Sequence, residues 1–198
     1  MAAKALGEIG ESEAAPALID VLDVRSRGLQ LAALKSLGQL HYSEALPAVR
    51  EFLDSPDPRL RRTAALTLGA LGDDRAVSSL LETARTDESP LVRPAAVEAL
   101  GMVGDSEVLD QLLPFVDDSN AYLRAALAHA LSSLDGDTAE VRNALEKLSG
   151  DEVRHVALAA QRSLANCSAP PTEGEDEDAC PEPDRKHLSW LRRFLGRD

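Results

Sequence analysis

The side chains best suited to metal or acid–base chemistry in this sequence are four histidines, His41, His129, His155 and His187. A metal site built on a helix needs a second ligand about one turn away from the first. None of the four has another histidine at such a spacing, and none is followed by glutamate. The histidines therefore do not indicate a metal centre, and we expect no cofactor.

The two cysteines, Cys167 and Cys180, are thirteen residues apart in a stretch rich in Pro, Glu and Asp. A zinc site needs closely spaced pairs of ligands, so this spacing matches no standard zinc motif. A regulatory disulfide between the two stays open. The sequence also lacks a phosphate-binding loop, a nucleophile elbow and a Ser-His-Asp set. We assign no catalytic residue and expect that the chain is not an enzyme.

Arginines recur at intervals of 30 to 32 residues, each directly after an aliphatic residue: Arg61, Arg93, Arg124 and Arg154. Because a guanidinium group binds carboxylates and other anions through two parallel hydrogen bonds, two interpretations arise. The row is either an anion-binding site or a structural ladder. We favour the structural ladder, with aspartates such as Asp54, Asp57 and Asp117 as partners.

Acidic residues repeat with a similar period and hold seven of nine related positions: Glu13, Asp20, Glu44, Glu51, Glu82, Glu107 and Glu146. The other two positions hold Arg75 and Pro114. These acids form either the solvated side of amphipathic helices or a groove that binds a basic helix or tail of a protein partner. Binding in such a groove would weaken steeply with added salt.

The elements that carry these residues belong to a unit that returns every 31 or 32 residues. Its central leucine is Leu6, Leu37, Leu68, Leu100 and Leu131 in successive copies, and Gln161 replaces it in a degenerate sixth copy. Apolar residues at spacings of three and four predict helices. Gly72 and Asp73 provide a helix stop and the next N-cap. Each unit is therefore a first helix, which contains the central leucine, and an antiparallel second helix.

Neither helix of a unit can bury its apolar face alone, so successive units must stack into an α-solenoid. The pattern of aliphatic-Arg, Ala-Ala, Ala-Leu-Gly, Leu-Gly-Asp and Ala-Leu-Leu resembles the short HEAT-like repeats of the family named after phycobilisome bilin lyases, over residues 1 to about 165. The resemblance implies an all-α solenoid of five to six two-helix repeats. It also implies that the second helices, which carry the acidic residues, line the concave side.

Function does not follow from this fold, since similar arrays serve as bilin lyases, scaffolds, an iron hydroxylase and DNA glycosylases. The hydroxylase binds two irons through repeated His-Glu pairs, which this sequence lacks. A glycosylase would need a basic concave face with aromatic residues, and only 3% of the chain is aromatic. We therefore predict a protein-binding scaffold. The alternative is a bilin-lyase-like or other HEAT-type enzyme or accessory subunit.

Both ends of the array lack part of a unit. Met1 aligns with Thr63, and the helix from Val153 to about Ala165 has no second helix after it. Solenoid ends need polar caps or a packing partner. At the N-terminal end we expect that the sequence simply starts within a repeat and does not form a dedicated cap. Whether the chain is a fragment of a longer array stays open.

The repeats end near residue 165, and a different composition follows. Residues 166–184 form a proline-rich acidic stretch, which predicts a disordered linker. Residues 185–198 predict a basic amphipathic helix with a docking face. The residues of that face are Leu188, Trp190, Leu191, Arg192, Arg193, Phe194 and Leu195. The helix is too short to be stable alone, so we expect it to dock on its own array or on another protein; a membrane is disfavoured.

The charge of −13, from 34 acidic and 21 basic residues among 198, argues against nucleic acid as a partner because phosphate binding relies on Lys and Arg. No apolar run reaches the ~18 residues of a membrane span, and no secretory signal is recognisable. With only two cysteines, these features predict a cytoplasmic protein. Excess acid with few lysines indicates a halophilic or GC-rich prokaryotic source.

Overall fold

The computed structural model describes residues 14–104, 106–134 and 138–167. The predictions for Glu13, His187, Cys180, most of the linker and the 185–198 helix lie outside these residues. In chain order the helices of the described part are α2 (Ala15–Leu22), α3 (Arg27–Leu40), η2 (Ser43–Ala45), α4 (Leu46–Arg50), η3 (Glu51–Asp54), α5 (Pro58–Leu71), η4 (Asp74–Ala76), α6 (Val77–Thr86), α7 (Val92–Val103), η5 (Ser106–Val108), α8 (Leu109–Leu112), η6 (Leu113–Asp117), α9 (Ala121–Ser133), α10 (Ala139–Ser149) and α11 (Arg154–Cys167).

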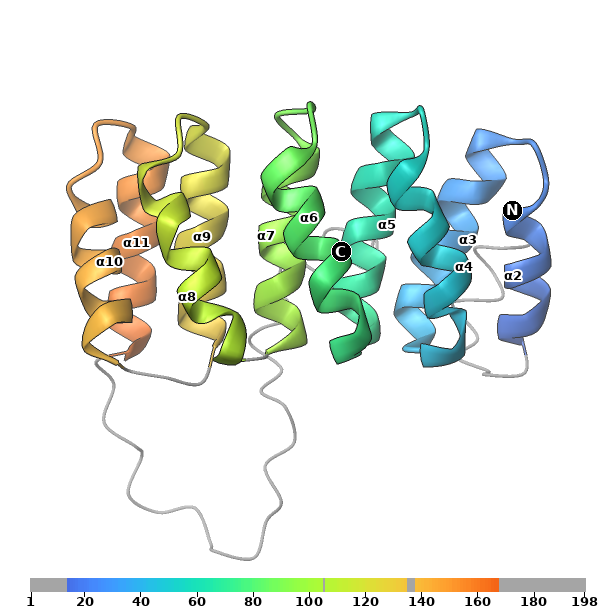
Figure 1. The fold of residues 1–198 in the computed structure, drawn as a ribbon, viewed down its shortest axis with the longest axis horizontal. Coiled ribbons are helices and arrows are strands. Elements are labelled where there is room, and N and C mark those ends of the chain that lie inside the picture. Colours follow the sequence, from blue (N-terminus) through green and yellow to red (C-terminus); the bar gives the residue numbers. More distant parts are fainter. Residues whose placement is uncertain (1–13, 105, 135–137, 168–198) are drawn as a thin grey trace, which may run out of the picture.

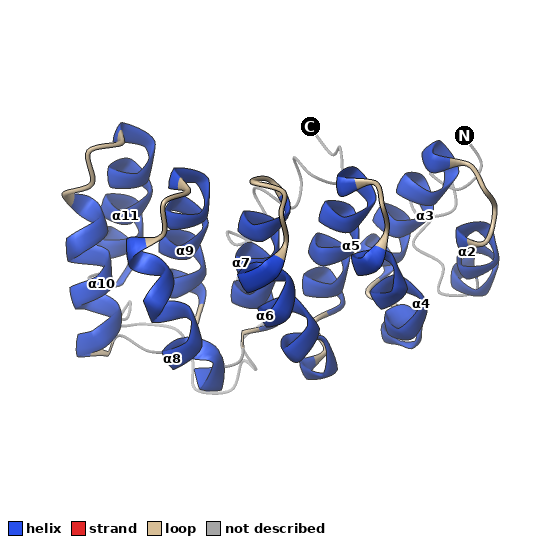
Figure 2. Cartoon of the chain, turned by 45° about the horizontal axis from the view of Figure 1, so that its top comes forward, coloured by secondary structure: helices blue, strands red, loops and turns tan. Residues whose placement is uncertain are grey.

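These helices form two layers that run the length of an elongated array (Figures 1 and 2). One layer holds the first helices, α3, α5, α7, α9 and α11. The other holds the second helices, which are α2, α4 with η3, α6, α8 with η6, and α10. The described residues contain no strand. The prediction of an all-α solenoid of two-helix repeats is confirmed.

The predicted stop and start signals act at the ends of helix α5. The helix begins at Pro58, and the Asp57 carboxylate caps it by accepting a hydrogen bond from the Arg59 N–H at 2.8 Å. It ends at Gly72, whose φ of 65° lies in the left-handed region that favours glycine. Asp73 then caps η4 by accepting from the Arg75 N–H at 3.0 Å. Local side-chain chemistry therefore sets the boundaries of this repeat.

The core lies between the two layers and follows the predicted periodicity. The central leucines Leu37, Leu68, Leu100 and Leu131 are all buried. Two polar side chains that enter the core bond to the backbone of the preceding first helix. The Thr67 hydroxyl donates to the Leu34 carbonyl at 3.1 Å, and the Ser163 hydroxyl donates to the Ala128 carbonyl at 2.8 Å.

Successive first helices pack unusually close to one another. A Cβ placed on Gly69 of α5 would lie 2.7 Å from the Ala99 Cα of α7, and one on Gly101 would lie 2.6 Å from the Ala130 Cα of α9. No real Cβ tolerates such distances, so the glycines after the central leucines Leu68 and Leu100 are what permit this approach. At Gly38, the equivalent glycine of α3, the contact is looser, since a Cβ would lie 3.4 Å from the Ala70 Cβ. Gly69 and Gly101, recognised in the sequence as part of the repeat pattern, are therefore close contact points between repeats.

The second helices are spaced more widely. Each of them packs mainly against the first helix that follows it, as α6 does on α7 and α10 on α11, and contacts between successive second helices are much fewer than those between successive first helices. The layer of closer spacing lies on the inside of a curved stack. The first helices therefore line the concave side, which corrects our expectation that the second helices do so.

Candidate functional site

The junctions between repeats carry three arginine–aspartate pairs, which we call rungs. Arg61 Nε and Nη2 donate to the Asp87 carboxylate at 2.8 and 3.1 Å. Arg93 Nη2 donates to Asp118 at 2.5 Å. Each rung links the first turn of one first helix to the loop before the next first helix.

The third rung has the same two-pronged form, with Arg124 donating to Asp151 at 2.6 and 2.9 Å. Its third nitrogen donates to the Asp118 carbonyl at 2.7 Å. Arg154 occupies the next ladder position at the start of α11 and is exposed. The prediction that the arginines bond to junction aspartates is thus confirmed for Arg61, Arg93 and Arg124.

The particular aspartates expected as partners were wrong. Asp57 pairs with Arg27 at 3.3 Å and Asp117 pairs with Lys147 at 2.7 Å, while Asp54 is exposed at the end of η3. The arginines reach forward across the stack to the following junction because consecutive first helices lie so close. Sequence distance alone favoured the nearer carboxylates.

Each rung aspartate also shapes its own loop. Oδ1 of Asp87, Asp118 and Asp151 accepts a hydrogen bond at 2.8 Å from the backbone N–H two residues later. This is the Asx-turn geometry that aspartate favours before a helix. One carboxylate therefore closes the turn and holds the arginine of the preceding repeat.

The rungs are shielded from solvent. The side chains of Arg61 and Asp87 are 9% and 7% exposed, and those of Arg124 and Asp151 are 15% and 10% exposed. Hydrogen bonds from Arg124 are the largest cause that lowers the pKa of Asp151, and the pKa of Arg61 is raised by its bond to Asp87. Removing one partner of such a shielded pair leaves the other charge without compensation, which destabilises the fold more than the loss of an exposed pair.

Acid should weaken the third rung in a predictable range of pH. Because the pKa of Asp151 is lowered from 3.8 in the folded protein, its contribution to stability is complete above that value and is lost as the pH falls through the folded-state pKa. Urea unfolding of the wild type and of Asp151→Asn should differ at pH 7 and converge towards pH 3. Glu152→Gln, an exposed neighbour, serves as control. Parallel stability curves from pH 7 to pH 3 would contradict this role.

Charge is segregated between the two layers. Among the described first helices, from α3 to α11, the single acid is Glu98, whose pKa is raised because burial disfavours its charge. Their basic residues are Arg27, Lys35, Arg59, Arg61, Arg62, Arg93, Arg124, Arg154 and Arg162. The second helices are rich in acids instead. In the described part, the first-helix layer is therefore positively charged and the second-helix layer negatively charged.

The predicted acidic positions that the structure describes all lie on the second-helix layer and are exposed: Asp20, Glu44, Glu51, Glu82, Glu107 and Glu146. Three of them lie in 3₁₀ turns, Glu44 in η2, Glu51 in η3 and Glu107 in η5. The acidic set thus faces solvent along the outer layer, not inside a concave groove. We call this set the acidic ladder.

The three histidines in the described ranges lie apart from one another and form no cluster. His41 ends α3 with a φ of 50°, and its Nδ1 lies 2.6 Å from the Ala70 carbonyl oxygen. His155 stacks on Tyr122 with 5.2 Å between ring centroids, and His129 is exposed. In the described residues no three His, Cys, Asp or Glu side chains gather at metal-binding distance. No helix there is long and apolar enough to span a membrane.

Comparison with known families identifies the repeats. A model of HEAT repeats matches residues 24–100 and 77–165, and a model of the PBS lyase HEAT-like repeat matches residues 1–23. No curated protein is similar enough to match the chain.

Among solved structures, the complex of CpcE and CpcF of phycocyanin lyase from Nostoc sp. PCC7120 contains a chain that is 26% identical, with a TM-score of 0.64 over 78% of this chain and 99% of that one. A designed armadillo repeat protein in complex with the peptide (KR)4 is 18% identical, with a TM-score of 0.58 over 84% and 91%. A computationally designed armadillo repeat protein for modular peptide recognition is 18% identical, with a TM-score of 0.55 over 83% and 91%.

Proposed function

Because the chain belongs to the HEAT-repeat family, whose model matches residues 24–100 and 77–165, we propose that it is a non-enzymatic scaffold that binds a basic segment of another protein. The single observation that carries the proposal is the exposed acidic ladder along the outer layer. The ladder extends over the second helices from α2 to α10, so an extended segment of a partner can lie along it. We also propose that the protein acts in the cytoplasm.

Electrostatic complementarity supports a basic partner. Acids of the ladder follow one another from α2 to α10, so their fields add along an extended segment of the partner. These carboxylates are exposed, so each pairwise contact is weak and affinity would arise from many of them. Association would therefore be fast and strongly dependent on ionic strength.

The proposal is tested by titrating the protein with a fluorescent octalysine peptide. We expect Glu82→Gln to weaken binding about threefold, since one exposed ion pair contributes up to about 1 kcal/mol. Glu152→Gln, the same change at an exposed junction residue outside the ladder, should leave the affinity unchanged. Affinity should also fall steeply between about 50 and about 300 mM salt, a range over which the screening length shortens about 2.5-fold. Equal affinities of the two variants, or insensitivity to salt, would contradict the ladder as the binding surface.

One observation favours a second function, an accessory subunit or enzyme related to bilin attachment. The phycocyanin lyase chain is matched over 99% of its length at 26% identity. No residue of the present chain is assigned to chromophore handling, and the one cysteine among the described residues is Cys167, at the end of α11. Pigmented protein on co-expression with a bilin pathway and a phycobiliprotein acceptor would favour this function, and colourless acceptor would favour the scaffold.

A further inference from the structure

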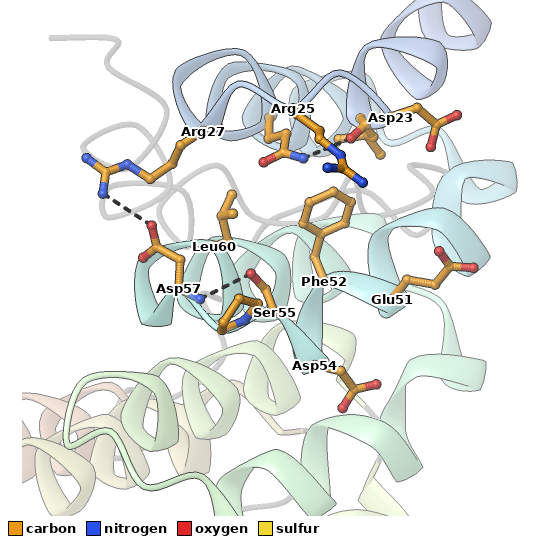
Figure 3. Close-up of a pocket in the computed structure, with 12 residues that line it drawn as sticks. Asp23, Arg25, Arg27, Glu51, Phe52, Asp54, Ser55, Asp57 and Leu60 are labelled. Carbon is orange, nitrogen blue, oxygen red and sulfur yellow. Dashed lines mark hydrogen bonds and ion pairs between the residues drawn. The ribbon is translucent and has the colours of Figure 1, made fainter.

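A pocket of about 750 Å³ opens between the first two junctions of the described array (Figure 3). One wall comes from the end of α2 and the start of α3, and the other from η3 and the start of α5. Phe52 points into the space between these walls, with Leu60 beside it. The pocket therefore has an apolar floor between two turns of the backbone.

The pocket coincides with the place where a rung is missing. Gln30 lies 31 residues before Arg61, and Ser55 lies 32 residues before Asp87. These are the positions of the arginine and the aspartate in the other rungs, and both residues line the pocket. Ser55 keeps the turn, since its hydroxyl accepts from the Asp57 N–H at 3.3 Å, but neither residue supplies a charge. Both partners of the ion pair are replaced together.

The residual groups at this junction suit a guanidinium group from outside. Gln30 donates to the Leu22 carbonyl at 3.0 Å, and its amide is uncharged. Asp23, Glu51 and Asp54 place exposed carboxylates at the rim. The two basic residues of the lining are Arg25 and Arg27, and Arg27 is paired with Asp57, so acids exceed bases around the opening.

We propose that this pocket binds an arginine side chain carried by a basic segment of another protein, in the place of the absent rung. The aliphatic part of the arginine lies on Phe52 and Leu60, and its planar guanidinium donates to the rim carboxylates and to Ser55. Lysine fits less well, because its single ammonium group cannot make parallel hydrogen bonds. The proposal rests on the proposed function in that the partner is basic, and it adds a defined site and a preference for arginine.

The decisive variant is Gln30→Arg/Ser55→Asp, which rebuilds the rung inside the chain. We expect it to raise the melting temperature and to weaken binding of an octa-arginine peptide about tenfold, because the internal guanidinium occupies the site. Binding of octalysine, which has the same charge, should change little. Wild-type protein should prefer octa-arginine over octalysine. Equal affinity for the two peptides, or unchanged octa-arginine binding by the variant, would overturn the proposal.

A second variant leaves the core untouched. Asp23→Asn/Asp54→Asn removes two exposed carboxylates of the rim, and Asp74→Asn/Asp110→Asn makes the same change at exposed positions away from the pocket. Only the rim variant should lose the preference for octa-arginine. Glu82→Gln separates the two proposals, because it should weaken the binding of both peptides equally. If this variant loses affinity but keeps the preference for octa-arginine, the pocket proposal holds independently of the ladder. Equal behaviour of the rim and control variants would refute it.

Discussion

Arg61→Ala is expected to lower the free energy of unfolding by about 2 to 3 kcal/mol, because it leaves a buried carboxylate without its partner. Asp87 is only 7% exposed and receives two hydrogen bonds from Arg61. The remaining guanidinium nitrogen also donates to the Ser55 carbonyl at 3.0 Å, so the substitution breaks contacts on both sides of the junction. Urea unfolding at pH 7, followed by circular dichroism, measures the loss.

Arg75→Ala is the matched control for that experiment. Arg75 also donates two-pronged bonds to an aspartate, Asp73, at 2.6 to 3.1 Å, but its side chain is 66% exposed. Water replaces the lost bonds at such a site, so the stability should hardly change. If Arg61→Ala and Arg75→Ala lowered the free energy of unfolding by the same amount, burial of the rung would not be the cause of the loss.

Gly101→Ala is the second change with a large expected effect, a loss of about 2 kcal/mol from overpacking between two backbones. The added Cβ would lie 2.6 Å from the Cα and 2.8 Å from the Cβ of Ala130. Neither atom belongs to a flexible side chain, so α7 and α9 must move apart along the stack. Thermal unfolding of the variant should show a clear decrease in melting temperature.

Gly28→Ala provides the comparison within a helix of the same layer. Nothing lies within 4 Å of a Cβ at Gly28, and its φ is not positive. Alanine is a better helix former than glycine by about 1 kcal/mol, so this variant should be as stable as the wild type or more so. If Gly28→Ala were destabilised and Gly101→Ala were not, close contact between α7 and α9 would not be the reason for glycine at position 101.

Much of the architecture could be predicted because its causes are local. The helix stop at Gly72, the caps at Asp57 and Asp73 and the apolar stripe through Leu68 depend on residues within one or two turns. Repetition of the same signals every 31 or 32 residues then requires stacking. The identity of the repeat family follows from the same residues.

The sites were harder to predict because they depend on which repeats meet and at what distance. The arginine row indicated a ladder, yet the partner of Arg61 is Asp87, 26 residues ahead, and not the nearby Asp57. The first junction departs from the ladder in both Gln30 and Ser55. Once the other rungs were known, the repeat register would have shown that both positions of this rung are replaced.

Helix periodicity, capping residues and a repeat length of about 31 residues are properties of the sequence, and they determine a solenoid of two-helix repeats. In the described part its first helices carry mainly bases and its second helices mainly acids. The curvature of that solenoid does not follow from local sequence signals. It depends on how closely Gly69 and Gly101 let successive first helices approach, and this distance puts the acidic ladder on the outer layer. The same spacing brings each arginine to the next junction and leaves a pocket where the pair is absent, because hydrogen bonds form only where packing brings donor and acceptor together.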